Sequence, residues 1–222
     1  MVQKSNERSL GSERVRRRAE ERRAEILRAA GRVFRRLGYA GAGMREIARE
    51  ADLSPANLYH YFSGKDEILY FCQNRALDSM LEALEAARLS GEQPATQLAE
   101  LLRAHVHCLL DEVEGAAAHL EVEALPRQQR EAIIRKRDGY ERGLRAIVAA
   151  GMSRGAFVSC DARLVTRAML GAVNWSARWF RPEGPRTAAS VADGLAEFLV
   201  RGLVEGPSRS NAQSGVAGRG VS

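Results

Sequence analysis

Residues 44–62 read MREIAREADLSPANLYHYF, two short helical patterns separated by a three-residue break. The first pattern places Met44, Ile47 and Ala48 on one helical face, and Leu53 follows in the break. The second pattern opens with Ser54-Pro55, which pairs a good helix cap with a proline at the first helical position, where a missing N–H costs nothing. This spacing predicts a helix-turn-helix, a motif that places its second helix in the major groove of DNA.

The second helix of this motif has two distinct faces. Leu58 and Phe62 are four residues apart and should point together into the core. The opposite face presents short or polar groups that could reach base edges and phosphates, namely Pro55, Ala56, Asn57, Tyr59 and His60.

The positive charge of the chain is concentrated around this motif. The 222 residues carry a formal charge of +6, yet residues 1–65 hold 15 Lys and Arg against 8 Asp and Glu. The remaining residues hold 19 Lys and Arg against 20 Asp and Glu. The whole excess of positive charge therefore lies around the helix-turn-helix, where a phosphate-binding surface would need it. A solvated N-terminal tail would give the same asymmetry, which makes charge weaker evidence than spacing.

Every long periodic segment has the helical repeat, so we expect an all-α protein of about nine helices. The break Ser90-Gly91-Glu92-Gln93-Pro94 and the loss of basic bias beyond it indicate a second, larger helical region. The expected organisation is a disordered basic arm (1–18), a three-helix DNA-binding domain (19–65), a ligand-binding and dimerisation domain (66–205) that starts with a connecting helix (66–88), and a disordered tail (206–222). Within the larger domain the patterns predict helices over about 95–113, 116–124, 127–151, 161–179 and 187–204.

The sequence contains no pattern typical of a membrane segment or of a catalytic centre. The longest apolar runs are too short to span a bilayer and the N-terminus is charged, so we expect a soluble, cytoplasmic protein. His105 and His107 are two residues apart on a helix and therefore face different ways, so no metal is expected.

No P-loop or Ser-His-Asp pattern is found, so we expect neither a cofactor nor an enzyme. The rival interpretation is a helical enzyme that acts on an acyl thioester or another small molecule and binds a cofactor phosphate at its basic end.

The chain resembles the tetracycline-repressor (TetR) family of transcriptional regulators from about Arg23 to Phe71. The matching residues recur at the family's spacings: Ile26-Leu27-x-Ala29-Ala30, Phe34, Gly38-Tyr39, Met44-Arg45-Glu46-Ile47-Ala48 and Leu58-Tyr59-His60-Tyr61-Phe62-x-x-Lys65. This resemblance implies a DNA-binding head followed by a larger helical region that dimerises and binds a ligand.

The resemblance also implies roles for individual residues at the DNA. Arg45 corresponds to a base-reaching or phosphate-binding arginine, with a solvated surface charge as the alternative. Ala56 and Asn57 match the base-facing start of the recognition helix, although Asn57 could merely cap locally. Phosphate contacts are implied for Tyr59, His60, Tyr61 and Lys65, with a core role as the alternative for one of the tyrosines. Where many relatives have Ser or Thr, this chain has Ala42-Gly43, so that side-chain phosphate contact is missing.

The segment Asn174-Trp175-x-x-Arg178-Trp179-Phe180-Arg181-Pro182-x-Gly184 looks like one found in family members that control the breakdown of fatty acids, sterols or aromatic acids, several of which respond to acyl-coenzyme A thioesters. An acyl chain needs an apolar tunnel and the coenzyme's phosphates need arginines. We therefore expect tunnel walls at Leu109, Tyr140, Leu144 and Trp175, and phosphate partners at Arg178, Arg181, Arg135 and Arg137. Ordinary core, interface or surface roles are the alternative for each of them.

The family pairs its last two long helices into a four-helix bundle between subunits, which implies a homodimer. The expected interface residues are Val173, Trp179, Leu195, Phe198 and Leu199. The function implied is a homodimeric repressor that leaves a palindromic double-stranded DNA operator when a small hydrophobic or acyl-coenzyme A inducer binds.

Overall fold

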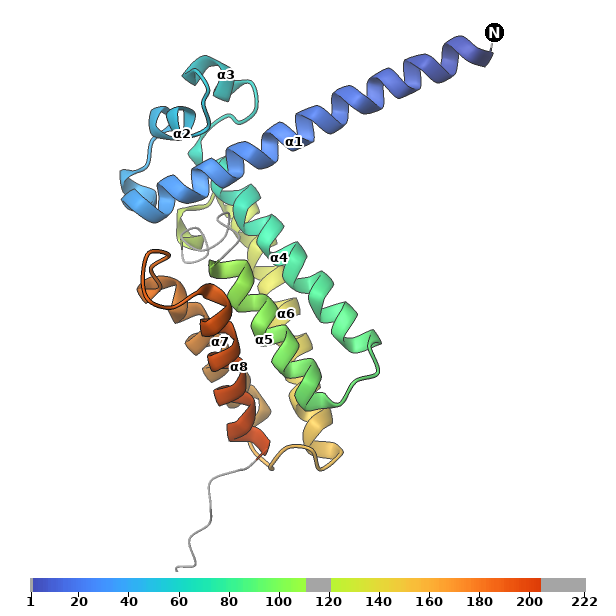
Figure 1. The fold of residues 1–222 in the computed structure, drawn as a ribbon, viewed down its shortest axis with the longest axis vertical. Helices are drawn as coiled ribbons and strands as arrows, with labels where there is room; N and C mark the ends of the chain where they lie inside the picture. The colour runs from blue at the N-terminus through green and yellow to red at the C-terminus, as the bar shows by residue number, and fades with distance from the viewer. Residues whose placement is uncertain (1, 111–120, 205–222) are drawn as a thin grey trace, which may run out of the picture.

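A computed structural model of the protein describes residues 2–110 and 121–204, and within these ranges it contains helices and no β-strand. The described helices are α1 (Val2–Gly41), α2 (Met44–Glu50), α3 (Pro55–Tyr59), α4 (Lys65–Leu89), α5 (Pro94–Leu110), the short 3₁₀-helix η1 (Val122–Ala124), α6 (Arg127–Ser153), α7 (Ala162–Trp179) and α8 (Ala188–Val204). The predicted all-α fold is confirmed. Figure 1 shows a head, formed by α1 to α3, above a longer body formed by α4 to α8.

The head is organised around a small apolar core. Ile26, Phe34, Ile47, Leu58 and Phe62 are buried there, so each of the three helices contributes to it. α1 is kinked near its end, where Gly38 has φ 70° and ψ 164°, a positive-φ conformation that favours glycine. The chain turns there and then enters α2.

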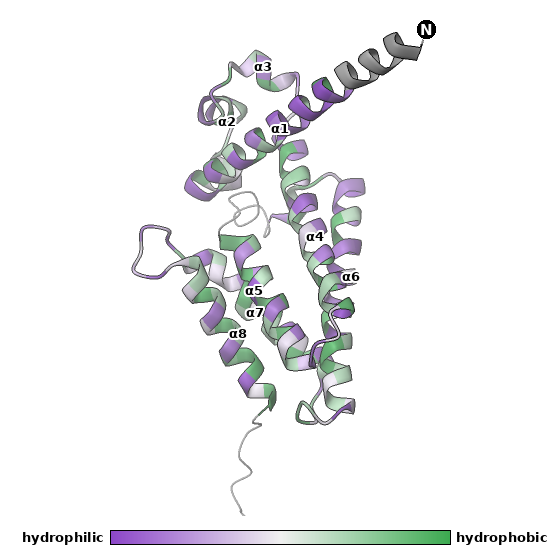
Figure 2. Ribbon diagram, turned by 45° about the vertical axis from the view of Figure 1, so that its right-hand side comes forward, coloured by the Kyte–Doolittle hydropathy of each residue, from purple (hydrophilic) through white to green (hydrophobic). Residues whose placement is uncertain are grey.

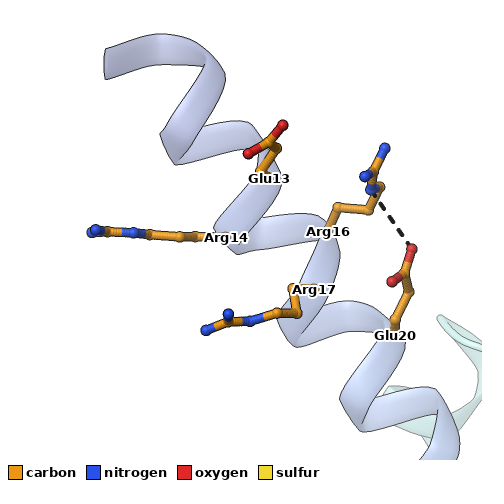
Figure 3. Close-up of a pocket in the computed structure, with 5 residues that line it drawn as sticks. All are labelled: Glu13, Arg14, Arg16, Arg17 and Glu20. Carbon is orange, nitrogen blue, oxygen red and sulfur yellow. Dashed lines mark ion pairs between the residues drawn. The ribbon is translucent and has the colours of Figure 1, made fainter. Parts of the chain in front are cut away.

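The N-terminal part of α1 differs from the disordered arm expected over residues 1–18. In the structure α1 begins at Val2 and projects away from the rest of the molecule (Figure 1). Ion pairs four residues apart, Arg16 Nε–Glu20 Oε1 at 3.7 Å and Arg17 Nε–Glu21 Oε1 at 3.4 Å, are of the kind that supports an exposed helix. This helix is strongly hydrophilic where it leaves the head (Figure 2), and Arg14 and Arg17 point to one side of it, away from the Arg16–Glu20 pair (Figure 3).

The body is a helical bundle in which α5 packs against α4, α6, α7 and α8. α4 extends from the head into this bundle and packs along α6. At Gly143 a Cβ atom would lie 2.1 Å from Leu84 Cδ2, so a larger residue at this position would displace the Leu84 side chain between α4 and α6. α7 begins with a side-chain cap, because Asp161 accepts hydrogen bonds from the backbone N–H groups of Arg163 and Leu164.

One predicted helix differs from the structure, and the end of another lies outside the described residues. Of the helix expected over 116–124, residues Val122–Ala124 form a single 3₁₀ turn. Pro126 explains its end, because a proline disfavours helical geometry in the residue before it, and Leu125 is accordingly extended with φ −79° and ψ 144°. The helix expected over 95–113 is α5, which is described to Leu110; residues 111–120 and the tail predicted over 206–222 lie outside the described residues.

Within residues 2–110 and 121–204, no helix is long and apolar enough to cross a membrane. Across the same ranges, no group of three or more His, Cys, Asp or Glu side chains is placed to hold a metal ion. His105 is fully buried whereas His107 is half-buried, as the two-residue spacing predicts for opposite sides of α5.

Candidate nucleic-acid interface

The turn between α2 and α3 is fixed by local backbone geometry. Asp52 takes a left-handed conformation with φ 53°, which Asp tolerates better than most residues. The backbone N–H of Leu53 then donates to the Ala48 carbonyl at 2.9 Å and closes α2. Ser54 begins α3 as predicted, since its Oγ accepts a hydrogen bond from the Asn57 backbone N–H at 3.1 Å.

The outward face of α3 carries the side chains expected to meet DNA. Leu58 is completely buried and anchors the helix to the head core. The other predicted residues of this face are all solvent-exposed in the structure: Pro55, Ala56, Asn57, Tyr59 and His60. Tyr59 is the largest of them, with 55% of its surface exposed. A single buried residue therefore positions five exposed ones, which is the arrangement a recognition helix needs.

The start of α2 is built without a capping side chain. Gly43 is the N-cap residue, with φ −123° and ψ 166°, and it supplies no side-chain hydrogen bond. The Glu46 carboxylate lies back against it, with Oε2 2.6 Å from the position that a Cβ on Gly43 would take. A serine or threonine at position 43 would displace this carboxylate. Arg45, on the same turn, is exposed.

Two residues expected at phosphates also make contacts inside the protein. The Lys65 Nζ donates to the carbonyl oxygens of Tyr39 and Ala42 at 3.1 and 3.2 Å and lies 4.5 Å from the centre of the Tyr39 ring. Tyr61 is half-buried against the head core, and its carbonyl accepts a hydrogen bond from Arg23. Of the three aromatic residues at 59–61, Tyr61 is thus the one that contributes to the core.

Two arginines of α1 that sequence reasoning counted only as positive charge hold the motif together. Arg22 Nη2 donates to the carbonyls of Ala51 and Asp52 at 3.2 and 3.4 Å, in the turn between α2 and α3. Arg23 Nη2 donates to the Tyr61 carbonyl at 2.9 Å, and its guanidinium lies over two phenylalanine rings, 4.9 Å from the centre of Phe62 and 5.2 Å from that of Phe71. A sequence signal exists, since both arginines lie four residues before Ile26 and Leu27 of the apolar stripe.

Glu50, the last residue of α2, receives two more arginines of α1. Arg32 Nε donates to Glu50 Oε1 at 2.7 Å, and Arg36 Nη1 and Nη2 lie 3.2 and 3.3 Å from Oε2. The hydrogen bond from Arg32 is the main reason why the pKa of Glu50 lies below its usual range. Part of the basic excess of residues 1–65 therefore serves internal contacts, which lowers the charge left for DNA.

The residues predicted for a ligand site separate into two groups. Leu109, Tyr140 and Leu144 are buried together in the body core. Trp175 is 65% exposed on α7, and Arg178, Arg181 and Arg135 are exposed as well. The prediction of Trp175 as a tunnel wall in the same protomer is therefore wrong, because α7 turns this side chain outward.

Polar side chains accompany the buried group, and sequence reasoning named only some of them. The His105 ring packs edge-on against Tyr140 with centroids 5.3 Å apart. Burial lowers the pKa of His105 to about 4, a hydrogen bond with Asn174 opposes this shift, and the nearby Arg137 adds to it. Burial also lowers the pKa of Arg137, to about 10. The core of the body thus contains a polar cluster, His105, Arg137, Tyr140 and Asn174, contributed by α5, α6 and α7.

The residues predicted for the dimer interface also divide. Val173 is 0% exposed within the single chain, so its prediction as an interface residue is wrong: it packs inward on α7. Trp179 and Phe198 are exposed, while Leu195 and Leu199 are half-buried. Leu164 is a further exposed apolar residue of α7, on the same side as Trp175 at spacings of the helical repeat.

The buried head core, the exposed α3 and the separate helical body define a helix-turn-helix protein of the DNA-binding class. Comparison with known proteins supports this. Residues 26–70 match the model "Bacterial regulatory proteins, tetR family", and residues 91–203 match "Tetracyclin repressor-like, C-terminal domain". The chain belongs to the TetR family of transcriptional regulators. The family consists of regulators and not enzymes, so the rival interpretation as a helical enzyme is set aside.

Three relatives illustrate the likeness over most of the chain. The transcriptional repressor KstR2 of Mycobacterium tuberculosis is 26% identical over 196 residues, which cover 87% of this chain and 98% of KstR2. The crystal structure of PfmR from Thermus thermophilus is 34% identical and covers 79% of this chain and 97% of its own, with a TM-score of 0.72. AibR, solved in complex with isovaleryl coenzyme A and operator DNA, is 25% identical, with coverages of 81% and 98% and a TM-score of 0.67.

Proposed function

We propose that this protein is a homodimeric repressor that binds a palindromic DNA operator and leaves it when an acyl thioester or a similar hydrophobic ligand enters the body. The observation that carries the DNA-binding part is the exposed face of α3, anchored on the buried head core. Asn57 is its main base-reading group, because an asparagine side chain can pair with adenine through two hydrogen bonds. Arg45, Tyr59 and His60 flank it and would contact phosphates or bases.

The dimer is proposed to form through the outward sides of α7 and α8. Trp175 and Phe198 are 65% and 75% exposed, and large aromatic groups are enriched in the cores of interfaces. Added Cβ atoms at Gly171 on α7 and at Gly194 and Gly202 on α8 would meet nothing within 4 Å, so this surface is open in the single chain. A two-fold axis here would place two copies of α3 at successive major grooves, about 34–36 Å apart.

The ligand site is proposed in the body core, at the cluster of His105, Arg137, Tyr140 and Asn174. Buried polar groups beside Leu109 and Leu144 suit a ligand with one polar carbonyl end and an apolar chain. The similarity to AibR, which was solved with an acyl thioester, supports this chemical class. Binding would favour one spacing of the heads over another, and DNA affinity would fall by the difference in ligand affinity between the two states.

The DNA-binding proposal is tested by fluorescence anisotropy with labelled DNA that flanks the protein's own gene. A specific complex should be about 10³-fold tighter or more than that with unrelated DNA, and it should weaken steeply with salt. Finding only equal, weak binding to both DNAs would contradict the proposal for these flanking sequences.

The ligand proposal is tested by thermal shift with acyl-coenzyme A thioesters of increasing chain length and with free aromatic acids as the comparison. A ligand at 100 times its Kd stabilises the native state by about 2.7 kcal/mol, which a melting curve detects readily. The same compound should release the labelled DNA. If free acids stabilise the protein and no thioester does, the acyl thioester is the wrong class.

A further inference from the structure

A cavity of about 760 Å³ lies between the head and the body, outside the proposed apolar ligand site. One wall is the C-terminal part of α1, and the other is the end of α7 with the connection to α8, which lies beneath that end of α1 in two views (Figures 1 and 2). Both walls contribute arginines to it: Arg32, Arg35 and Arg36 from α1, and Arg178 and Arg181 from the α7 side.

The strongest observation in this cavity is one guanidinium nitrogen that has no hydrogen-bond partner among the described residues. Arg35 Nη2 is buried, and the described residues offer it no hydrogen-bond partner. Burial lowers the pKa of Arg35, and Glu183 across the cavity raises it only in part. A buried charged N–H group without a partner is rare in native proteins, and an unoccupied anion site is one explanation for it.

The charge balance of the cavity is positive. Glu121 and Glu183 also line it, and Glu50 holds Arg32 and Arg36 from outside. Among the described residues, two carboxylates and five guanidinium groups line the cavity, and a third carboxylate pairs with two of these arginines from outside it. Arg181 donates to the carbonyl oxygens of Arg178 and Phe180 at 3.2 and 3.0 Å. Both acceptors are neutral, so these hydrogen bonds do not neutralise the charge of Arg181.

We propose that this junction cavity binds a multiply charged phosphate group, of the kind carried by a diphosphate ester. Arginine forks match phosphate oxygens in geometry, and guanidinium groups on opposite walls suit an anion with more than one charged centre. The volume is that of a small-molecule site, and Tyr39 and Phe180 offer aromatic surface beside it. The inference extends the proposed function, since the diphosphate of a coenzyme thioester is one source of such an anion and a free nucleotide or pyrophosphate is another.

The cavity is placed to influence the DNA-binding motif. Arg32 and Arg36 face the cavity and at the same time hold Glu50 at the end of α2. A phosphate that draws these two arginines toward itself competes with Glu50 and loosens α2 from α1. Occupation of the cavity should therefore weaken DNA binding, independently of what occupies the body core.

The test is isothermal titration of the full chain with two probes, inorganic pyrophosphate and coenzyme A without an acyl chain, at constant ionic strength. We expect at least one probe to bind, and its Kd to rise tenfold or more in Arg35→Gln and in Arg181→Gln. Arg181 is exposed, so its variant should fold normally, as circular dichroism will check. The matched control is Arg88→Gln, which removes the same charge at the far end of α4 and should leave Kd unchanged.

The two probes separate the sources, because binding of coenzyme A alone indicates a coenzyme and binding of pyrophosphate indicates a smaller diphosphate. The cavity proposal is overturned if neither probe binds the wild-type protein, or if Arg88→Gln weakens binding as much as the cavity variants do. If thioesters release DNA but neither probe binds, the cavity proposal is wrong and the proposed acyl thioester ligand stands. If the probes bind through Arg181 but no thioester releases DNA, the proposed acyl thioester ligand is wrong and the cavity proposal stands.

Discussion

Arg32 Nε and Glu50 Oε1 are 2.7 Å apart, and this ion pair joins the C-terminal part of α1 to the last residue of α2. Arg36 reaches the other carboxylate oxygen of Glu50 at 3.2 Å. Because α2 packs against α3, this carboxylate helps to hold α3 in place through α2. The same two arginines line the junction cavity, so Glu50 is connected through them to the side of the head that faces the body.

Glu50→Gln should reduce stability by about 0.3–1 kcal/mol, the usual range for partly exposed ion pairs, and should also reduce DNA affinity. Urea denaturation and DNA titration measure the two effects. The pKa of Glu50 is lowered in the folded state, so its contribution is present above the unfolded value near 4.5 and is lost as pH falls through the lowered pKa. Glu85→Gln, on α4 and paired to Arg88 at 3.9 Å, is the control and should leave DNA affinity unchanged. Equal DNA affinities for Glu50→Gln and the wild type would show that α2 does not need this pair.

Lys65→Ala should cost about 1–3 kcal/mol of stability, because the ammonium donates to the carbonyl oxygens of Tyr39, in the last turn of α1, and of Ala42, just after it. If its remaining N–H also meets a phosphate, as we propose, the slope of log Kd against log salt should fall by about 0.9. Lys136→Ala removes an ammonium that bonds Asn74 at 2.7 Å in the body, and it should lower stability without changing that slope. An unchanged slope in Lys65→Ala would assign this residue to the loop alone.

Asn57→Ala and Ser54→Ala separate base reading from capping within one helix turn. Ser54→Ala removes the cap of α3 and should cost about 1 kcal/mol of stability, with a uniform loss of DNA affinity. Asn57→Ala leaves the backbone N–H that the cap uses, so stability should stay constant while about 1–3 kcal/mol of discrimination is lost at one base pair. Binding to a set of single-base operator variants measures this. A uniform loss across the set would indicate a capping or phosphate role for Asn57.

The helix-turn-helix could be predicted because its determinants are local. Ser54, Pro55 and Leu58 act within one helix, and their spacing alone gives the cap, the start and the buried anchor. The roles of Arg22, Arg23 and Glu50 could not be found in this way. Each depends on a contact 14 to 38 residues away in the chain, which exists only after α1 has packed across the motif.

The faces of α7 could not be assigned from its sequence, for a related reason. Val173 and Trp175 are both apolar and two residues apart, so they point to different sides of the helix. One side packs on the body and the other is exposed, and a helix with apolar groups on both sides gives no local sign of which is which. The shared cavity could not be predicted either, because neither the charge nor the spacing of Arg178 and Arg181 indicates that they lie near the arginines of α1.

The buried His105 predicts a pH dependence of stability. Its pKa is about 4 in the folded state against 6.5 for the free side chain, so the unfolded chain binds the extra proton between these values. Stability should therefore fall as pH decreases from about 6.5 to about 4, by at most about 1.4 kcal/mol per pH unit. His105→Gln should flatten this part of the profile, whereas His60→Gln, at an exposed site on α3, should not. A profile equally steep in both variants would assign the loss of stability to other groups.

Phe198→Glu should produce a folded monomer with weak DNA binding. The Phe198 side chain is 75% exposed in the single chain, so its replacement costs the protomer little, while a carboxylate in an apolar dimer interface would be buried without a partner. A dimer holds both half-sites at once, and the loss of this linkage should lower operator affinity by about 10²- to 10⁴-fold. Light scattering gives the mass of the particle, and circular dichroism checks the fold. Leu89→Glu replaces a residue of similar exposure, 76%, at the far end of α4 and should remain a dimer with normal affinity. If Phe198→Glu stays dimeric while the wild type is a dimer, the subunits meet on another surface, and the head spacing must then be derived from that surface instead.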